Sequence, residues 1–250
     1  MFRKTGIVVF LFTGLVATSF TPFYPGHHAE QTRPGPRERK IQKEVFSQIV
    51  SFRDYVKDTF LVEVNKDKVD GQKVRQAFLK SRLLFKKFEW AAEYFNADLT
   101  KRLNGPPVQE IENADLLDPS LALGVDPMGM QVIEQLIYPA CDAAGQKELL
   151  SEVRHLVTNT EYLISYFASQ QLADWRILDA AKLEVFRIIA LGITGFDNPL
   201  SLNSMEESSA SLKSLRDILR LYIKKKTPSL ENLDAAIAYL QQHPDFDSFD

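Results

Sequence analysis

Apolar residues recur every three or four positions along most of the chain, which is the spacing of one face of an α-helix. The first series consists of Ile41, Val45, Ile49, Phe52, Val56 and Phe60. The second series, spaced 4-3-4-3-4-3, consists of Val74, Phe78, Ser81, Phe85, Phe88, Ala92 and Phe95. Stripes of this kind pack against neighbouring helices at a shallow angle. The pattern therefore predicts long helices over residues 38–60 and 74–95.

Similar patterns predict further helices over residues 127–138, 143–169, 174–193, 208–225 and 230–242. Residues 174–193 are apolar around most of the helix circumference, so we expect that helix to be central. Its few charges, which include Glu184 and Arg187, must then find partners, because unpaired buried charge is costly. No alternating strand pattern of useful length is present. The predicted fold class is all-α: an antiparallel bundle of about six helices.

The longest interruption of the helical pattern lies between Asn104 and Pro127. Asn104 and Gly105 readily end a helix, and Pro106 and Pro107 prevent its continuation. The segment is longer than a structureless link inside a bundle usually is. We therefore interpret it as a functional or packing loop, with Glu110 among its acidic residues.

The stretch DPMGMQVIEQLIYP, residues 126–139, follows this loop. We predict Asp126 as the N-cap of a short helix that Pro139 ends, with Gly129 leaving room for a close neighbour. Gln131 and Glu134 are three residues apart and share a face. They are either a structural anchor that hydrogen-bonds a neighbouring element, or a polar patch in which Glu134 meets a buried arginine or a ligand.

The N-terminus reads MFRKTGIVVFLFTGLVATSF, two basic residues followed by an apolar run over residues 6–20. That run is short for a bilayer span, which needs about 20 residues, and fits a secretory signal peptide. We expect a signal peptide at 1–21, a Pro- and Gly-containing linker at 22–37 and the bundle at 38–250. An inner-membrane signal anchor is the alternative. The mature form is expected to have no membrane span.

Composition and chemistry narrow the function classes. The chain has 250 residues, 45% apolar and 25% charged, which suits one domain with a core. The net charge of −3 gives no basic surplus for nucleic acid. Cys141 is the single cysteine, so there is no internal disulfide and no C-x-x-C-H for haem c. We find no catalytic residue and no metal-binding motif; Glu134 is the one weak metal candidate.

One resemblance concerns the segment around Gly129. It is similar to the G-x-H-x-x-E segment of the imelysin family, periplasmic helical bacterial proteins linked to iron uptake. Gly129 and Glu134 match that pattern, whereas Gln131 stands where the family has histidine. A primary amide is a poor ligand for a transition metal, so the family's metal or haem role does not transfer directly.

A closer resemblance covers most of the predicted bundle. The stretches FRDYVKDTF, VRQAFLKSRLLFKKFEWAAEYFNADLTKRLNGPPVQEIE and GMQVIEQLIY resemble the helical region ahead of the haem domains in some di-haem cytochrome c peroxidases of Bacteroidetes-type bacteria. This implies a periplasmic accessory or regulatory domain. Its partner would be a haem-containing peroxidase domain on the same or a separate chain, and haem c there would reduce hydrogen peroxide.

Two alternatives remain open beside that interpretation. The first is a free-standing imelysin-like protein that binds iron or haem in the periplasm, and the second is a purely structural bundle. In the favoured interpretation we expect residues 104–112 to pack over the short helix, with an arginine as a partner. The candidate ligand or interface residues are Gly129, Gln131, Glu134, Asn104, Gly105, Pro106, Pro107 and Glu110.

Overall fold

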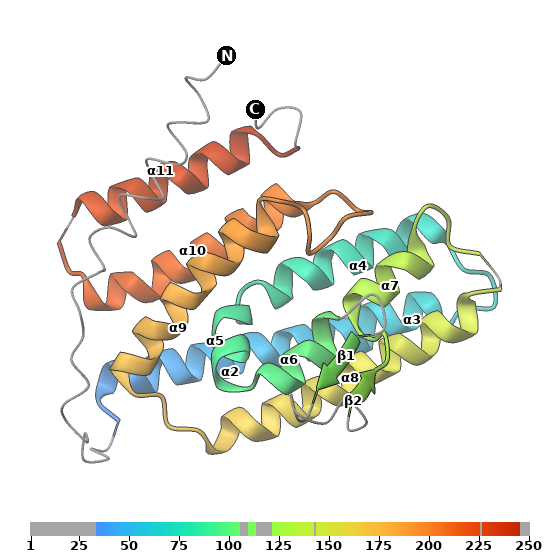
Figure 1. Cartoon of the computed structure of the whole chain (residues 1–250), viewed down its shortest axis with the longest axis horizontal. Helices are drawn as coiled ribbons and strands as arrows, with labels where there is room; N and C mark the ends of the chain where they lie inside the picture. Colours follow the sequence, from blue (N-terminus) through green and yellow to red (C-terminus); the bar gives the residue numbers. More distant parts are fainter. Residues whose placement is uncertain (1–33, 106–109, 114–121, 143, 226, 246–250) are drawn as a thin grey trace.

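The computed structural model describes residues 34–105, 110–113, 122–142, 144–225 and 227–245 (Figure 1). The predicted signal peptide, residues 1–21, and most of the predicted linker lie outside these residues. Within them the fold is an all-α bundle, as predicted. Six long rods form its frame: α2–η1–α3, α4, α8, α9–η3, α10 and α11. Three short helices, α5, α6 and α7, complete it.

The first rod is continuous from Pro36 to Val64. It comprises α2 (Pro36–Tyr55), the π-helical turn η1 (Val56–Phe60) and α3 (Leu61–Val64). Pro36 occupies the first helical turn, and the Glu38 carboxylate accepts a hydrogen bond from the Gly35 amide. Every residue of the first predicted apolar series is buried. The predicted linker ended at residue 37, so its last two positions are helical instead.

The second predicted helix is wrong in its middle, because the chain turns at residues 86–88. It forms α4 (Gly71–Phe85), which Asp70 caps through the amides of Gln72 and Lys73, and α5 (Glu89–Phe95). Phe85 and Phe88 are both buried and meet edge to face, with ring centroids 5.3 Å apart. The turn also directs Lys86 into the interior, where its ammonium meets carboxylates.

Three elements were not anticipated from the apolar pattern. Helix α6 (Ala97–Asn104) starts at Asn96, whose side chain accepts from the Leu99 amide at 3.1 Å, and it ends at Asn104 as the Asn-Gly pair indicated. The strands β1 (Glu110–Asn113) and β2 (Ala122–Val125) pair antiparallel, with Glu110 opposite Val125. A four-residue ladder is too short to produce a clear alternation in sequence.

The following helices complete the bundle. They are α7 (Met130–Ile137), α8 (Gln146–Ser169), α9 (Asp174–Arg187) with the π-helical turn η3 (Ile188–Gly192), α10 (Ser204–Tyr222) and α11 (Pro228–Gln242). Helix α8 packs on α2, α6 and α7, whereas α10 packs on α11, α9, α5 and α4 (Figure 1). In the part of the chain that the structure describes, no helix combines the length and apolar character needed to cross a bilayer.

The prediction that residues 174–193 form the central helix is wrong. One side of the rod formed by α9 and η3 faces outward, where Leu183, Phe186 and Ile189 are exposed. Its inward face carries Glu184, which is buried. The apolar character of this helix therefore does not serve the core alone.

Candidate functional site

The two polar side chains of α7 both bind the loop between η3 and α10. The Gln131 Nε2 donates to the carbonyl oxygen of Asp197 at 3.3 Å. The Glu134 Oε1 accepts from the backbone amide of Ser201 at 2.8 Å. Burial raises the pKa of the Glu134 carboxyl, while the hydrogen bonds from Ser201 oppose that shift. These contacts are those of an anchor that fixes the loop.

Gly129, rather than Asp126, is the N-cap of α7, so the predicted start at Asp126 and Pro127 was wrong. Its φ of 78° suits glycine, and a Cβ there would lie 2.6 Å from the carbonyl oxygen of Leu103. The predicted room for a close neighbour is therefore confirmed. The Gly129 amide donates to the Glu152 carboxylate at 3.1 Å, and this fixes the helix start against α8.

Asn104 and Gly105, which precede the β-hairpin, also lie beside Asp197 and α7. The Asn104 Oδ1 accepts from Arg82 Nη1 at 3.1 Å, and its Nδ2 donates to Asp197 Oδ1 at 3.4 Å. A Cβ on Gly105 would lie 2.6 Å from Gln131 Oε1, so this backbone lies directly against α7. Pro106 and Pro107 are outside the described residues, and Glu110 opens β1.

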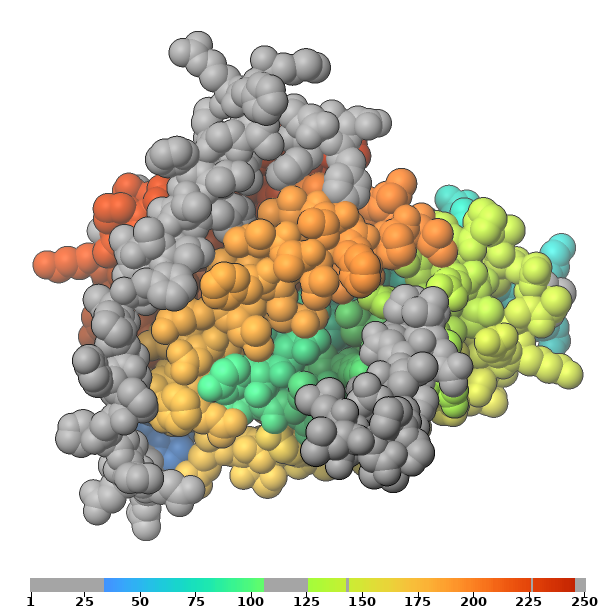
Figure 2. All heavy atoms as spheres, in the orientation of Figure 1, coloured from blue at the N-terminus to red at the C-terminus, as the bar shows by residue number. Residues whose placement is uncertain are grey.

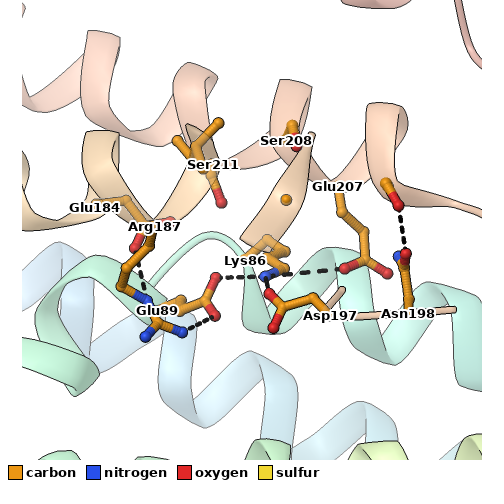
Figure 3. Close-up of a pocket in the computed structure, with 12 residues that line it drawn as sticks. Lys86, Glu89, Glu184, Arg187, Asp197, Asn198, Glu207, Ser208 and Ser211 are labelled. Atoms are coloured by element: carbon orange, nitrogen blue, oxygen red, sulfur yellow. Dashed lines mark hydrogen bonds and ion pairs between the residues drawn. The ribbon is translucent and has the colours of Figure 1, made fainter. Parts of the chain in front are cut away.

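Asp197 connects this anchor to a set of ionisable side chains in the interior, which we call the buried charge cluster. Its members come from α4 and the turn after it, from α5, from α9, from the loop after η3, and from α10. Figure 3 shows all of them except Arg82. Except for Arg187, which is 20% exposed in its side chain, all are buried. The cluster consists of Arg82, Lys86, Glu89, Glu184, Arg187, Asp197 and Glu207.

The Arg82–Glu207 pair joins α4 to α10. The Arg82 Nε and Nη2 donate to the two carboxylate oxygens of Glu207 at 2.6 and 2.7 Å, a bidentate arrangement. Exposure of the two side chains is 0% and 2%. Burial by itself would lower the pKa of Arg82, but the carboxylates around it, Glu207 foremost, raise it above its usual value.

Lys86 is the centre of the cluster. Its Nζ lies 2.7 Å from Asp197 Oδ2, 2.7 Å from Glu89 Oε2 and 3.9 Å from Glu207 Oε2 (Figure 3). Burial disfavours the ammonium, yet these carboxylates raise the pKa of Lys86, so it stays charged. Burial likewise opposes ionisation of Asp197, but Lys86 and Arg82 hold its pKa below the usual range.

Arg187 completes the cluster on the α5 side. Its Nη2 lies 3.1 Å from Glu89 Oε1 and 2.8 Å from Glu93 Oε1, and its Nε lies 3.8 Å from Glu184 Oε2. Burial raises the pKa of Glu93 to about 7, with Arg187 opposing. Burial and the neighbouring Glu89 carboxylate raise the pKa of Glu184 well above its usual value. With Glu93 included, the carboxyl groups outnumber the cations by two. Glu93 and Glu184 are the two carboxyls that favour the protonated form.

The space inside the cluster is small. A cavity of about 10 Å³ lies among its members, Gly192 of η3 and the serines of α10. A Cβ on Gly192 would lie 2.6 Å from Ser208 Oγ, so the glycine lets α10 approach. This volume is at the lower limit for a single water molecule. The cluster interior is therefore too small for an organic substrate or a haem.

An open groove of about 390 Å³ lies elsewhere, along α2 and the end of α8. Its lining includes Arg39, Lys43, Phe46 and Phe167. It offers cationic and apolar side chains, but none of its lining residues is a His, Met, Cys or Tyr that ligates haem iron. Among the described residues no three His, Cys, Asp or Glu side chains converge to hold a metal ion.

The sequence predicted the polar contacts around α7 but not most of the buried charge cluster. It placed Gln131, Glu134, Asn104 and Gly105 together, and it noted that Glu184 and Arg187 need partners. It missed Arg82, Lys86, Glu89, Asp197 and Glu207. One signal was present, because Phe78, Arg82, Phe85 and Glu89 follow the same 4-3-4 spacing as an apolar face. Charges on such a face predict buried ion pairs.

Comparison of the sequence with models of known protein families and with curated protein sequences gives no significant match.

Proposed function

We propose that this chain is a periplasmic accessory or regulatory domain that acts with a di-haem cytochrome c peroxidase. The observation that supports this most is how the buried polar side chains are used. The Gln131, Glu134 and Asn104 side chains hold other segments of the same chain. The buried polar side chains of this bundle therefore bind other parts of the bundle itself, and this arrangement suits a binding or regulatory role.

The haem of the proposed partner belongs outside the described residues. Their cluster cavity is about 10 Å³, and the open groove lacks an axial ligand among its lining residues. Cys141 is half-buried, and burial raises the pKa of its thiol, so the reactive thiolate is disfavoured. In the proposal the haem module performs the reduction of peroxide, and this chain binds that module and alters its activity.

A first test is genetic context. Two C-x-x-C-H motifs in the reading frame after Asp250, or in an adjacent gene, support the proposed partnership. Their absence from both contradicts it.

The decisive test is biochemical. The purified full chain is titrated into a di-haem cytochrome c peroxidase of the same genome, and binding is followed by calorimetry alongside steady-state peroxide reduction. We expect a complex with a Kd below about 10 μM, about −7 kcal/mol or stronger, and a change in the peroxidase rate. No binding at 100 μM, or peroxide turnover by the isolated chain without haem, overturns the proposal.

A further inference from the structure

Exposed apolar side chains are concentrated in one segment of the fold. Nine large apolar residues of the described chain are exposed, and seven of them fall between residues 175 and 202. Figure 2 shows α9, η3 and the loop after them running across the visible face of the molecule. We call these seven residues the α9 face. They are Trp175, Leu183, Phe186, Ile189, Phe196, Leu200 and Leu202.

The four helical members point in similar directions. Trp175, Leu183, Phe186 and Ile189 are separated by eight, three and three residues. At 3.6 residues per turn these spacings fall within about 120° of the helix circumference. They therefore form a stripe, and the three exposed loop residues follow η3 in the chain.

The α9 face carries no exposed charge along most of its length. Between residues 183 and 202 the charged residues are Glu184, Arg187 and Asp197, and all three turn inward into the buried charge cluster. The local arrangement is thus inverted, with charges inside and apolar groups outside. Lys182 and Glu206 are the nearest exposed charges on either side in sequence.

The area of this face matches what an interface requires. Trp175, Phe186 and Phe196 are 49%, 51% and 69% exposed. With the four aliphatic side chains, the seven residues expose on the order of 700 Å². A standard protein interface covers about 800 Å² per partner, whereas the largest patch on a typical monomer is about 300–600 Å².

We propose that the α9 face binds the α9 face of a second copy of this chain, through a two-fold axis that passes close to Phe186. Across a two-fold axis each residue near the axis meets its own counterpart, so any charge there would face a like charge. The absence of exposed charge between residues 183 and 202 removes that repulsion. It is the pattern that a self-complementary surface needs.

A two-fold axis that crosses a helix makes the paired helices antiparallel. Lys182, four residues before Phe186, already pairs with Asp179 of its own helix at 3.3 Å, so its charge is partly compensated beside the axis. A membrane surface suits the face less well, because interfacial helices are rich in Lys and Arg, whereas α9 carries three acidic residues beside its three basic ones.

The test is the oligomeric state of the full chain in solution. Sedimentation equilibrium is measured between 1 and 100 μM on the wild type, on Phe186→Glu and on Tyr162→Glu. Tyr162 is the matched control, because it is a 59% exposed aromatic residue on α8. We expect a wild-type dimer, at least a 100-fold weaker dimer for Phe186→Glu, and a change below threefold for Tyr162→Glu.

Cross-linking checks the position of the axis. In a Cys141→Ser background, Phe186→Cys and Ile189→Cys are each treated with oxidised glutathione. Two thiols from two chains form one disulfide bond as the glutathione disulfide is reduced to two thiols. We expect a covalent dimer from at least one of them and none from Tyr162→Cys.

Several outcomes overturn the proposal. A wild type that is monomeric at 100 μM, a dimer that survives Phe186→Glu, or no cross-linking from either cysteine would each do so. A monomer that binds phosphatidylglycerol vesicles through Phe186 assigns the face to a membrane instead. If Phe186→Glu does not fold, as judged by circular dichroism, Phe186→Ser replaces it. The test does not involve the peroxidase, so its result is independent of the proposed function.

Discussion

Substitution of Glu207 by glutamine tests how the bundle is held together at its centre. The change keeps the shape of the side chain and removes its charge. Arg82 then keeps a neutral partner in place of the carboxylate that accepts two of its hydrogen bonds at 2.6 and 2.7 Å. The Arg82 side chain is fully buried, so water cannot replace the lost oxygen.

The expected loss is large for a single substitution. Breaking a buried ion pair by removal of one partner costs about 3–5 kcal/mol, because the remaining charge is left uncompensated. The amide of the substituted side chain still offers one acceptor oxygen, so we expect the lower end, about 3 kcal/mol. In a domain of this size 1 kcal/mol corresponds to about 2–4 °C, so Tm should fall by roughly 6–12 °C.

Urea unfolding followed by circular dichroism measures the loss of free energy of unfolding. Asp234→Asn is the control, since Asp234 pairs with Arg216 and Arg220 at the surface and is 42% exposed. Exposed pairs contribute about 0–1 kcal/mol. The double variant Arg82→Met with Glu207→Leu should regain part of the loss. A loss for Glu207→Gln no larger than that for Asp234→Asn would refute the reasoning.

Three further predictions concern single residues. The folded-state pKa of Glu93 is raised to about 7 from its ordinary 4.5, so the stability of the wild type should fall as pH rises through that range. Urea titrations should show the Glu93→Gln variant gaining about 2–3 kcal/mol relative to the wild type between pH 4.5 and 7.5. A difference that stays constant over this pH range would contradict the prediction. Gly129→Ala should lose more than about 2 kcal/mol in the same assay because of its positive φ and the nearby Leu103 carbonyl, whereas Gly71→Ala should change little. Glu134→Ala should lose about 1.5–3 kcal/mol and Glu134→Gln less than about 1, because only the glutamine retains an acceptor for the Ser201 amide; equal losses would exclude the anchor role.

The fold class was readable from the sequence because apolar spacing reports directly on helix faces. Every residue of the apolar series predicted for the first rod is buried, and the last helix was predicted within two residues of its start. The break at residues 86–88 was not readable, because the 4-3-4 rhythm continues through it. At this break Lys86 turns inward to Asp197 and Glu207, two carboxylates that come from distant segments.

The candidate site was only partly predictable for the same reason. Gln131 and Glu134 stand out as polar residues on a short apolar helix, and their partners are the backbone of residues 197 and 201. Spacing along one helix cannot say which loop will reach it. The apolar α9 was misplaced because a periodic pattern shows that a helix has apolar sides without showing what covers each side.

The buried charge cluster has a consequence for how this sequence can diverge. Lys86 contacts Asp197 and Glu89, Glu89 contacts Arg187, and Glu207 contacts Arg82. Replacement of one member leaves the charge of its partner uncompensated. Most single substitutions in the cluster should therefore be selected against, whereas simultaneous replacement of both partners is tolerated. Distant homologues should therefore show these positions covarying, kept as a block or lost together, even where the surrounding apolar positions drift independently.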